Sequence, residues 1–260
     1  MPPTQPSARN EIVDWYTSIP PVTKAIFTLT ILVTASPALQ LVHPSYMILL
    51  WGEIRSKLQL WRLITPFFLH GFGLGFAMNL YLIYRHSLQL ETQVFMGRTA
   101  DYVYFLLVTC ALQLAAAKFL DLLVMSNGLI MAVIYLWAQY NSEAMMNFMF
   151  GITFKALYLP WALVAYDFLL SGAVPKPSLL GIATAHIYYY FTAIYPRQGG
   201  VQYLKTPAFL HRLFPPVPIQ GNHSGAHVWP TQQQRQQQTQ PGRLNPFGGH
   251  SWGRGHRLGQ

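Results

Sequence analysis

The sequence contains few charged residues and almost no cysteine. Asp, Glu, Lys and Arg make up 10% of the 260 residues, whereas soluble domains carry about a quarter. A water-soluble globular fold is therefore not expected. Cys110 is the single cysteine, which excludes an internal disulfide framework and a cysteine-based metal cluster. It lies in an apolar run, and we interpret it as a packing residue.

Motifs for catalysis and energy conversion are missing as well. The sequence has no Gly-x-Ser-Gly segment and no Walker motif for nucleotide binding. Its nine histidines are scattered, and none forms a His-x-x-x-His pair on a predicted helix beside carboxylates. We therefore expect no catalytic residue, no cofactor and no bound metal.

Acidic residues are absent after residue 196. Seven of the basic residues follow that point, so this end contributes +7 to the formal net charge of +9. A basic end can indicate nucleic-acid binding. This one lacks dense basic clusters and interleaved aromatic residues, so no nucleic-acid partner is expected. In a membrane protein, the same asymmetry places the C-terminal side in the cytosol.

Apolar segments dominate the rest of the chain. Each has roughly the length that crosses the hydrocarbon core as a helix. Because an even number of spans puts both termini on one side, we predict an all-α polytopic membrane protein with cytosolic N- and C-termini. The predicted spans are residues 22–42, 72–90, 101–117, 122–140, 156–173 and 178–195.

The two ends of the chain differ from this pattern. Residues 1–20 contain no continuous apolar stretch of the kind a signal peptide needs, so we interpret them as a cytosolic segment. Ile12, Trp15, Tyr16 and Ile19 could share one face of a short interfacial helix, or the segment is a plain extension.

Residues 215–244 include "QQQRQQQTQ" with flanking Pro and Gly, a composition typical of a disordered linker.

Residues 43–70 form a long first loop that is both apolar and charged. Arg55, Lys57 and Arg62 break the charge rule, because this loop lies on the side opposite the cytosol. Such a composition suits the membrane interface, where Trp61 can lie at headgroup depth and Arg62 can extend its charge to water. We expect an interfacial segment that braces the bundle and contacts lipids.

Several motifs resemble the derlin family, in the family's order. They are "LQLWRLITPFF", "LETQVFMGRTADYVYFLL", "YLWAQYN", "FKALYLPW" and "HIYYYF", followed by a "TP.FL" pattern. The resemblance covers residues 12–214. Derlins are inactive relatives of the rhomboid intramembrane proteases, and Trp61-Arg62 matches the Trp-Arg pair of that superfamily. The resemblance implies that residues 21–214 form a six-helix rhomboid-like bundle in the endoplasmic reticulum membrane, with the first loop in the lumenal leaflet.

A rhomboid protease cuts with a serine from Gly-x-Ser-Gly on its fourth helix and a histidine on its sixth. Ser126 and His186 occupy comparable predicted helices, but Val124 and Met125 precede the serine. Ser126 can alternatively cap a helix, and His186 can be a packed or hydrogen-bonded residue. The missing motif favours a protein that is not an enzyme, with an active rhomboid-type protease as the alternative.

Two further features concern the predicted spans. Asp167 is an acid within a span, where it either faces a water-filled cavity or joins two helices. Gly181 and Ala185 provide a small-x-x-x-small face that lets helices approach closely. Derlins carry Gly-x-x-x-Gly at this place, so Ala185 is a departure from the family.

Residues 245–260 contain the pattern "SWGRGHRLG". It resembles the SHP box, the peptide with which derlins recruit the cytosolic ATPase p97 (Cdc48). Trp252 and Leu258 would anchor an extended peptide, and the glycines permit close backbone approach. The preceding linker would raise the effective concentration of the captured ATPase. The matching residues are Trp252, Gly253, Gly255, Arg257, Leu258 and Gly259.

The resemblance implies a non-enzymatic role in endoplasmic-reticulum-associated degradation. The bundle would act as a channel or locally thin the membrane, so that misfolded proteins return to the cytosol while p97 supplies the force. An endoplasmic-reticulum ubiquitin-ligase complex, misfolded clients and further copies of the chain, as a tetramer, are the implied partners. The unfolded protein response is the implied regulatory context. A solute transporter would need inverted repeats, which the sequence does not show.

Overall fold

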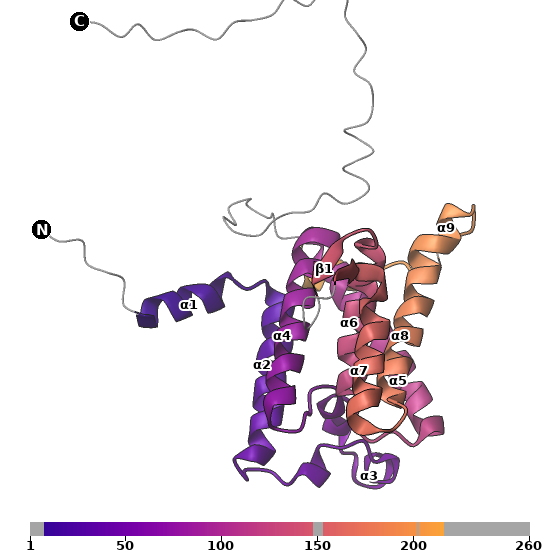
Figure 1. Ribbon diagram of the computed structural model, residues 1–260. Helices are drawn as coiled ribbons and strands as arrows, with labels where there is room; N and C mark the ends of the chain where they lie inside the picture. The colour runs from indigo at the N-terminus through magenta and orange to yellow at the C-terminus, as the bar shows by residue number, and fades with distance from the viewer. Residues whose placement is uncertain (1–7, 148–152, 202, 216–260) are drawn as a thin grey trace, which may run out of the picture. The chain divides into compact units, whose positions relative to one another are not determined.

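The computed structural model describes residues 8–147, 153–201 and 203–215. Six helices of 13 to 22 residues form its main body and lie side by side in Figure 1. Each overlaps one predicted apolar segment. They are α2 (Pro21–Ala38), α4 (Leu74–Gln89), α5 (Thr99–Leu120), α6 (Ser126–Tyr140), α7 (Leu159–Ser171) and α8 (Lys176–Tyr189).

Two of these helices, α2 and α5, are long and apolar enough to cross a membrane by length and composition alone, among the residues that the structure describes. Other helices gain length from the turns that follow them. A π-helical turn, η4 (Leu90–Val94), extends α4. A second, η7 (Tyr190–Ile194), joins α8 to α9 (Tyr195–Arg197). At 1.5 Å per residue, the path from α8 to α9 covers about 33 Å.

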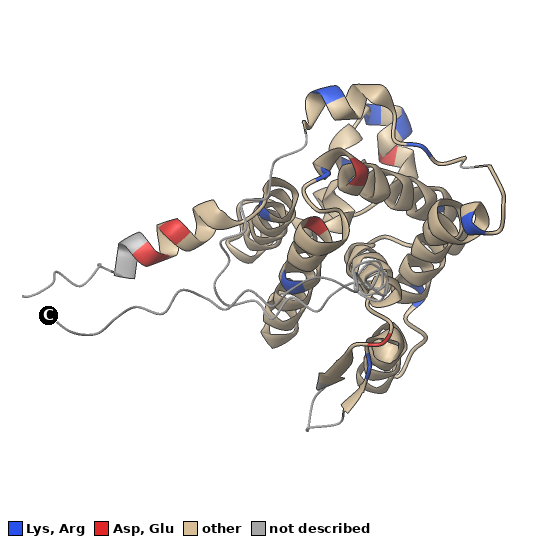
Figure 2. Ribbon diagram, turned by 90° about the horizontal axis from the view of Figure 1, so that it is seen from above, with Lys and Arg blue, Asp and Glu red and all other residues tan. Residues whose placement is uncertain are grey.

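Helix α6 lies at the centre of the bundle. Twelve of its fifteen residues are buried, as expected for a helix that is apolar on every side. It packs against α4, α7 and α8, and its contact with α8 is the most extensive between any two described elements. Figure 1 shows α6 between α4 and α8. Figure 2 shows how few positions along the ribbons of these helices are charged residues.

The first long loop is built from short helices. They are η1 (Pro44–Tyr46), α3 (Trp51–Lys57), η2 (Leu60–Leu63) and η3 (Thr65–Phe67). A small apolar core lies between the loop and the bundle. In it, Leu49, Ile54 and Phe67 are buried together with Met125, which precedes α6. The loop is therefore an ordered part of the fold.

The prediction of an all-α protein was incomplete. Strands β1 (Met145–Asn147) and β2 (Thr153–Lys155) form an antiparallel pair in which Met146 lies opposite Phe154. They lie between α6 and η6 (Ala156–Tyr158), which leads into α7. An exposed ion pair joins Lys155 to Glu143 across this hairpin at 3.0 Å.

The N-terminal segment contains the predicted short helix, α1 (Ala8–Ser18). It projects sideways from the end of the bundle at which α2 begins (Figure 1). Ile12 and Trp15 are exposed, whereas Ile19, just after the helix, is buried. The Trp15 ring contacts the rings of Phe27 and Tyr84, with centroids 5.9 and 5.7 Å away. An interfacial position for α1 stays a prediction.

Candidate functional site

Arg62 lies inside the first loop, with 3% of its surface exposed. Its Nη1 donates hydrogen bonds to the carbonyls of Ser45 (2.6 Å) and Ile48 (2.9 Å). Its Nε donates to Oε1 of Gln59 at 2.6 Å. The expectation that Arg62 extends its charge to water was therefore wrong, because backbone carbonyls of the same loop satisfy the guanidinium.

Trp61, next to Arg62, is half exposed. Its indole N–H donates to the carbonyl of Tyr46 at 3.2 Å, and the Thr65 hydroxyl donates to the carbonyl of Met47 at 2.8 Å. With Arg62, these side chains bind the carbonyls of four consecutive residues, 45–48. The Trp-Arg pair thus ties the start of the loop to its later half. Large apolar side chains remain exposed beside it at Leu58, Leu60 and Ile64.

Gly181 lies where α8 meets α6 most closely. A Cβ added to Gly181 would overlap the carbonyl of Gly128 on α6, and Ala185, one turn further along, is fully buried. Gln113 of α5 closes the junction, because its Nε2 lies 3.4 Å from both the Gly128 carbonyl and the Thr184 hydroxyl. Gly128 and Gln113 could not be predicted from the sequence, since no local pattern identifies the helix that faces Gly181.

Ser126 and His186 are not brought together as a catalytic pair. Nδ1 of His186 is 2.6 Å from the hydroxyl of Tyr135. Because Tyr135 lies nine residues after Ser126 on α6, about 13 Å of helix separates its level from that of Ser126. The interpretation of His186 as a hydrogen-bonded residue is confirmed.

The prediction that Ser126 caps α6 was wrong. Ser126 is the first residue of the helix, and Met125 occupies the cap position without a side-chain cap. The Met125 N–H instead donates to the carbonyl of Pro66 at 3.0 Å. The first loop therefore fixes where α6 begins, which a local capping rule does not take into account.

Asp167 joins two helices. Its Oδ2 accepts a hydrogen bond from the Ser178 hydroxyl at 2.9 Å, which links α7 to the first turns of α8. Ser178 is fully buried. Of the two interpretations open to the sequence, the structure supports the one in which Asp167 holds helices together.

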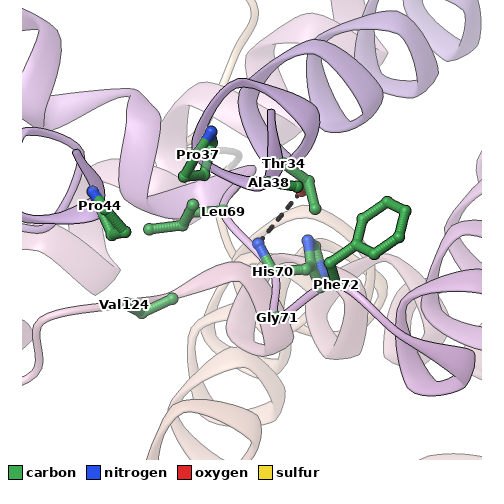
Figure 3. Close-up of a pocket in the computed structure, with 9 residues that line it drawn as sticks. All are labelled: Thr34, Pro37, Ala38, Pro44, Leu69, His70, Gly71, Phe72 and Val124. Atoms are coloured by element: carbon green, nitrogen blue, oxygen red, sulfur yellow. Dashed lines mark hydrogen bonds between the residues drawn. The ribbon is translucent and has the colours of Figure 1, made fainter. Parts of the chain in front are cut away.

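A pocket of about 410 Å³ lies between the end of α2 and the segment that leads into α4. Figure 3 shows Thr34, Pro37, His70 and Phe72 among the side chains around it. The Thr34 hydroxyl donates to the Phe68 carbonyl (3.0 Å) and accepts from the His70 N–H (3.2 Å). Burial lowers the pKa of His70 and outweighs the opposing effect of its contact with the Phe68 carbonyl. The imidazole is therefore neutral at neutral pH, and the pocket carries no charge.

Glu91 forms a buried polar site that no sequence pattern indicates. Its carboxylate accepts hydrogen bonds from the N–H groups of Val22 (3.1 Å) and Thr23 (2.8 Å) and from the Thr23 hydroxyl (2.8 Å). Ser87 and Tyr102 extend the network, with oxygen separations of 3.0 and 2.7 Å. Helix α2 has no capping side chain of its own, so Glu91 supplies the cap from the end of the neighbouring α4.

The predicted p97-binding tail, residues 245–260, lies outside the described residues, as does the predicted linker after residue 215. The structure therefore does not test the six matching positions. They remain a sequence-based prediction: Trp252, Gly253, Gly255, Arg257, Leu258 and Gly259.

Comparisons with known proteins agree with the resemblance seen in the motifs. Residues 19–208 match the model of the Der1-like family. The chain is 37% identical to Derlin-1 of Homo sapiens over 256 residues, which covers 96% of this chain and 99% of that protein. Derlin-1 of Oryza sativa subsp. japonica is 31% identical over 250 residues, covering 95% and 98% of the two chains. Derlin-1 of Arabidopsis thaliana is 36% identical over 203 residues, covering 77% and 76%.

Proposed function

This chain belongs to the Der1-like, or derlin, family, and we propose from this that it moves misfolded proteins of the endoplasmic reticulum back to the cytosol. Derlins are multi-pass proteins of the endoplasmic reticulum membrane and non-catalytic components of endoplasmic-reticulum-associated degradation. The observation that carries the proposal is the extent of the likeness, because the match to the human relative covers 96% of this chain.

The bundle would receive its clients without cutting them. Ser126 lies about 13 Å along α6 from the level at which His186 is bound, so Ser126 is not positioned for activation by that histidine. The protease alternative is set aside on this geometry and on the family. We propose a rhomboid-like arrangement of the six helices, which would offer a channel or a thinned membrane to the client.

The first loop would lie on the lumenal side, with both termini in the cytosol. The charge asymmetry after residue 196 supports this orientation. The exposed apolar side chains of the loop would enter the lumenal leaflet, while Arg62 holds the loop together from inside. Misfolded clients, an endoplasmic-reticulum ubiquitin-ligase complex and further copies of the chain, as a tetramer, are the proposed partners.

The C-terminal tail would recruit p97, whose ATP hydrolysis provides the force. Trp252 and Leu258 are the only large apolar side chains after Phe247. Burying such a side chain contributes about 1.5–3 kcal/mol, and about 1.4 kcal/mol corresponds to a tenfold change in affinity. Losing both should weaken binding a hundredfold or more.

Titration of the p97 N-domain with a peptide of residues 245–260 tests this. The double variant Trp252→Ala/Leu258→Ala should bind at least a hundredfold more weakly than the native peptide. The matched control is Arg254→Ala, because position 254 is unspecified in the pattern, and its affinity should be close to native. Equal affinity of the native and double-variant peptides would show that this pattern is not the docking site.

A further inference from the structure

The segment after α8 carries unpaired cations and large apolar side chains that are exposed, and one of the latter, Tyr203, stacks on Tyr195 with ring centroids 5.7 Å apart. We call residues 197–201 and 203–215 the strap; it includes α10 (Ala208–Leu213). Arg197, Lys205 and Arg212 are exposed, and none of them forms an ion pair or hydrogen bond within the described part of the chain. The exposed apolar side chains are Val201 (68%), Tyr203 (66%), Phe209 (63%) and Leu213 (67%).

The strap is fastened to the bundle at several points, and Leu204 packs against the main apolar core. The Thr206 hydroxyl donates to Oδ1 of Asp101, in the first turn of α5, at 2.6 Å. Leu210 is buried and α10 contacts α5. Phe209 and Leu213 are four residues apart, so they share a different face of α10. Phe209 and Leu213 are therefore exposed to solvent, whereas Leu210 is buried against the bundle.

Asp101 does not neutralise the three free cations. Its carboxylate already accepts a hydrogen bond from the Thr206 hydroxyl. The same carboxylate lies 3.4 Å from Nη1 of Arg98 and 3.8 Å from Nε2 of His211. No acidic residue follows position 196 in the sequence. The strap therefore carries an uncompensated positive charge next to exposed aromatic and aliphatic side chains.

A membrane crossed by the helical path from α8 to α9 would have its surface at the level of the strap. The continuous path from Lys176 to Arg197 covers about 33 Å, close to the ~30 Å thickness of a hydrocarbon core. The strap follows directly and returns to the first turn of α5. Tyrosine, lysine and arginine gather at such interfaces, because their apolar portions remain in the membrane while their polar ends reach water.

We propose that the strap binds the anionic phospholipid headgroups of the adjoining leaflet. The cations would contact phosphate and carboxylate groups, and Phe209 and Leu213 would enter the acyl boundary. This attachment would hold the start of the C-terminal region at the membrane surface. That the leaflet is the cytosolic one rests on the proposed function. Charge favours anionic over zwitterionic lipid, by roughly fivefold in affinity per basic residue near the surface.

A fluorophore on the strap of the full-length protein tests the proposal. Cys110→Ala removes the single native cysteine, and Ala208→Cys adds an exposed labelling site on α10. The labelled protein is placed in nanodiscs of phosphatidylcholine, alone or with about one third phosphatidylserine. In the nanodiscs that contain phosphatidylserine, we expect the emission of the fluorophore to shift to the blue and to be quenched by doxyl-labelled lipid. High salt should reverse both effects, because salt screens exposed charge.

Three variants of the labelled protein separate charge from apolar insertion. The triple variant Arg197→Gln/Lys205→Gln/Arg212→Gln should lose the response to phosphatidylserine, because the affinity of the strap for the anionic surface should fall roughly a hundredfold. Phe209→Ser/Leu213→Ser should lose the blue shift and the quenching. Lys118→Gln, an exposed cation in the last turn of α5, is the control and should behave like the parent protein.

Equal emission in the two kinds of nanodisc would overturn the proposal, as would a shift that neither salt nor the triple variant alters. A response that appears only after an acidic soluble protein is added would assign the strap to that partner instead. The assay contains no p97 and both leaflets are identical, so its failure would be distinct from failure of the proposed function. The proposed orientation is tested separately, by protease protection of the termini in microsomes.

Discussion

Removing the Glu91 carboxylate should destabilise the bundle by detaching the start of α2. Pro21 has no N–H, and the Lys24 N–H is bonded to the Pro20 carbonyl. The two remaining N–H groups of this turn, on Val22 and Thr23, both donate to Glu91. Because Glu91 is 2% exposed, water cannot readily replace the lost acceptor.

The magnitude follows from these contacts. A hydrogen bond to a charged group contributes about 1.5–3 kcal/mol, and an unpaired buried donor carries a further penalty. We expect Glu91→Ala to lower the free energy of unfolding by about 3–5 kcal/mol, since truncating one member of a buried charged site has effects of this size. Glu91→Gln keeps one acceptor and loses the charge opposite the helix dipole, so about 1–2 kcal/mol is expected.

The measurement is titration of the purified protein from detergent into sodium dodecyl sulfate, followed by circular dichroism. Glu11→Gln is the control, because Glu11 is exposed on α1, and it should lie within about 0.5 kcal/mol of the native protein. A double-mutant cycle of Glu91→Ala with Thr23→Ala should be non-additive, since the two side chains share a bond. If Glu91→Ala lowered the free energy of unfolding no more than the Glu11→Gln control does, the capping role of Glu91 would be refuted.

Two other predictions concern the loop and the helix junction. Gly181→Leu should lower the free energy of unfolding by at least about 1–3 kcal/mol, because the new side chain meets a backbone carbonyl of α6. Ala183→Leu, at an exposed position of the same helix, should have little effect in the same titration, and equal losses would contradict the steric argument. Arg62→Gln should lengthen the half-life of a misfolded client in cells, because it removes hydrogen bonds to two loop carbonyls. Arg55→Gln, an exposed cation of the same loop, should leave that half-life unchanged, and a native half-life in both would argue against the loop's role.

The positions of the helices could be predicted from the sequence because they depend on local composition. All six predicted spans contain a helix, and the differences lie at the ends. The span predicted at 122–140 begins as α6 only at Ser126. Asp121 takes a left-handed conformation, with φ of 51°, at the end of α5. The short stretch after it serves the small core beneath the first loop, where Leu122 and Met125 are buried.

The polar contacts could not be predicted in the same way, because their partners are distant in sequence. Arg62 was expected in water since a guanidinium is costly to bury, but two backbone carbonyls compensate it. Glu91 and Gln113 looked like ordinary polar residues near the ends of apolar segments. Their roles depend on which helices are neighbours, and periodicity within one segment does not contain that information.

The cap on α2 also imposes an order in time. Val22 and Glu91 are 69 residues apart, and a ribosome adds about 5–20 residues per second. The first turn of α2 therefore waits roughly 3–14 s after its own synthesis before its acceptor exists. Throughout that interval, water or lipid headgroups must solvate its two free N–H groups. The first turn of α2 is therefore completed only after the end of α4 has been made.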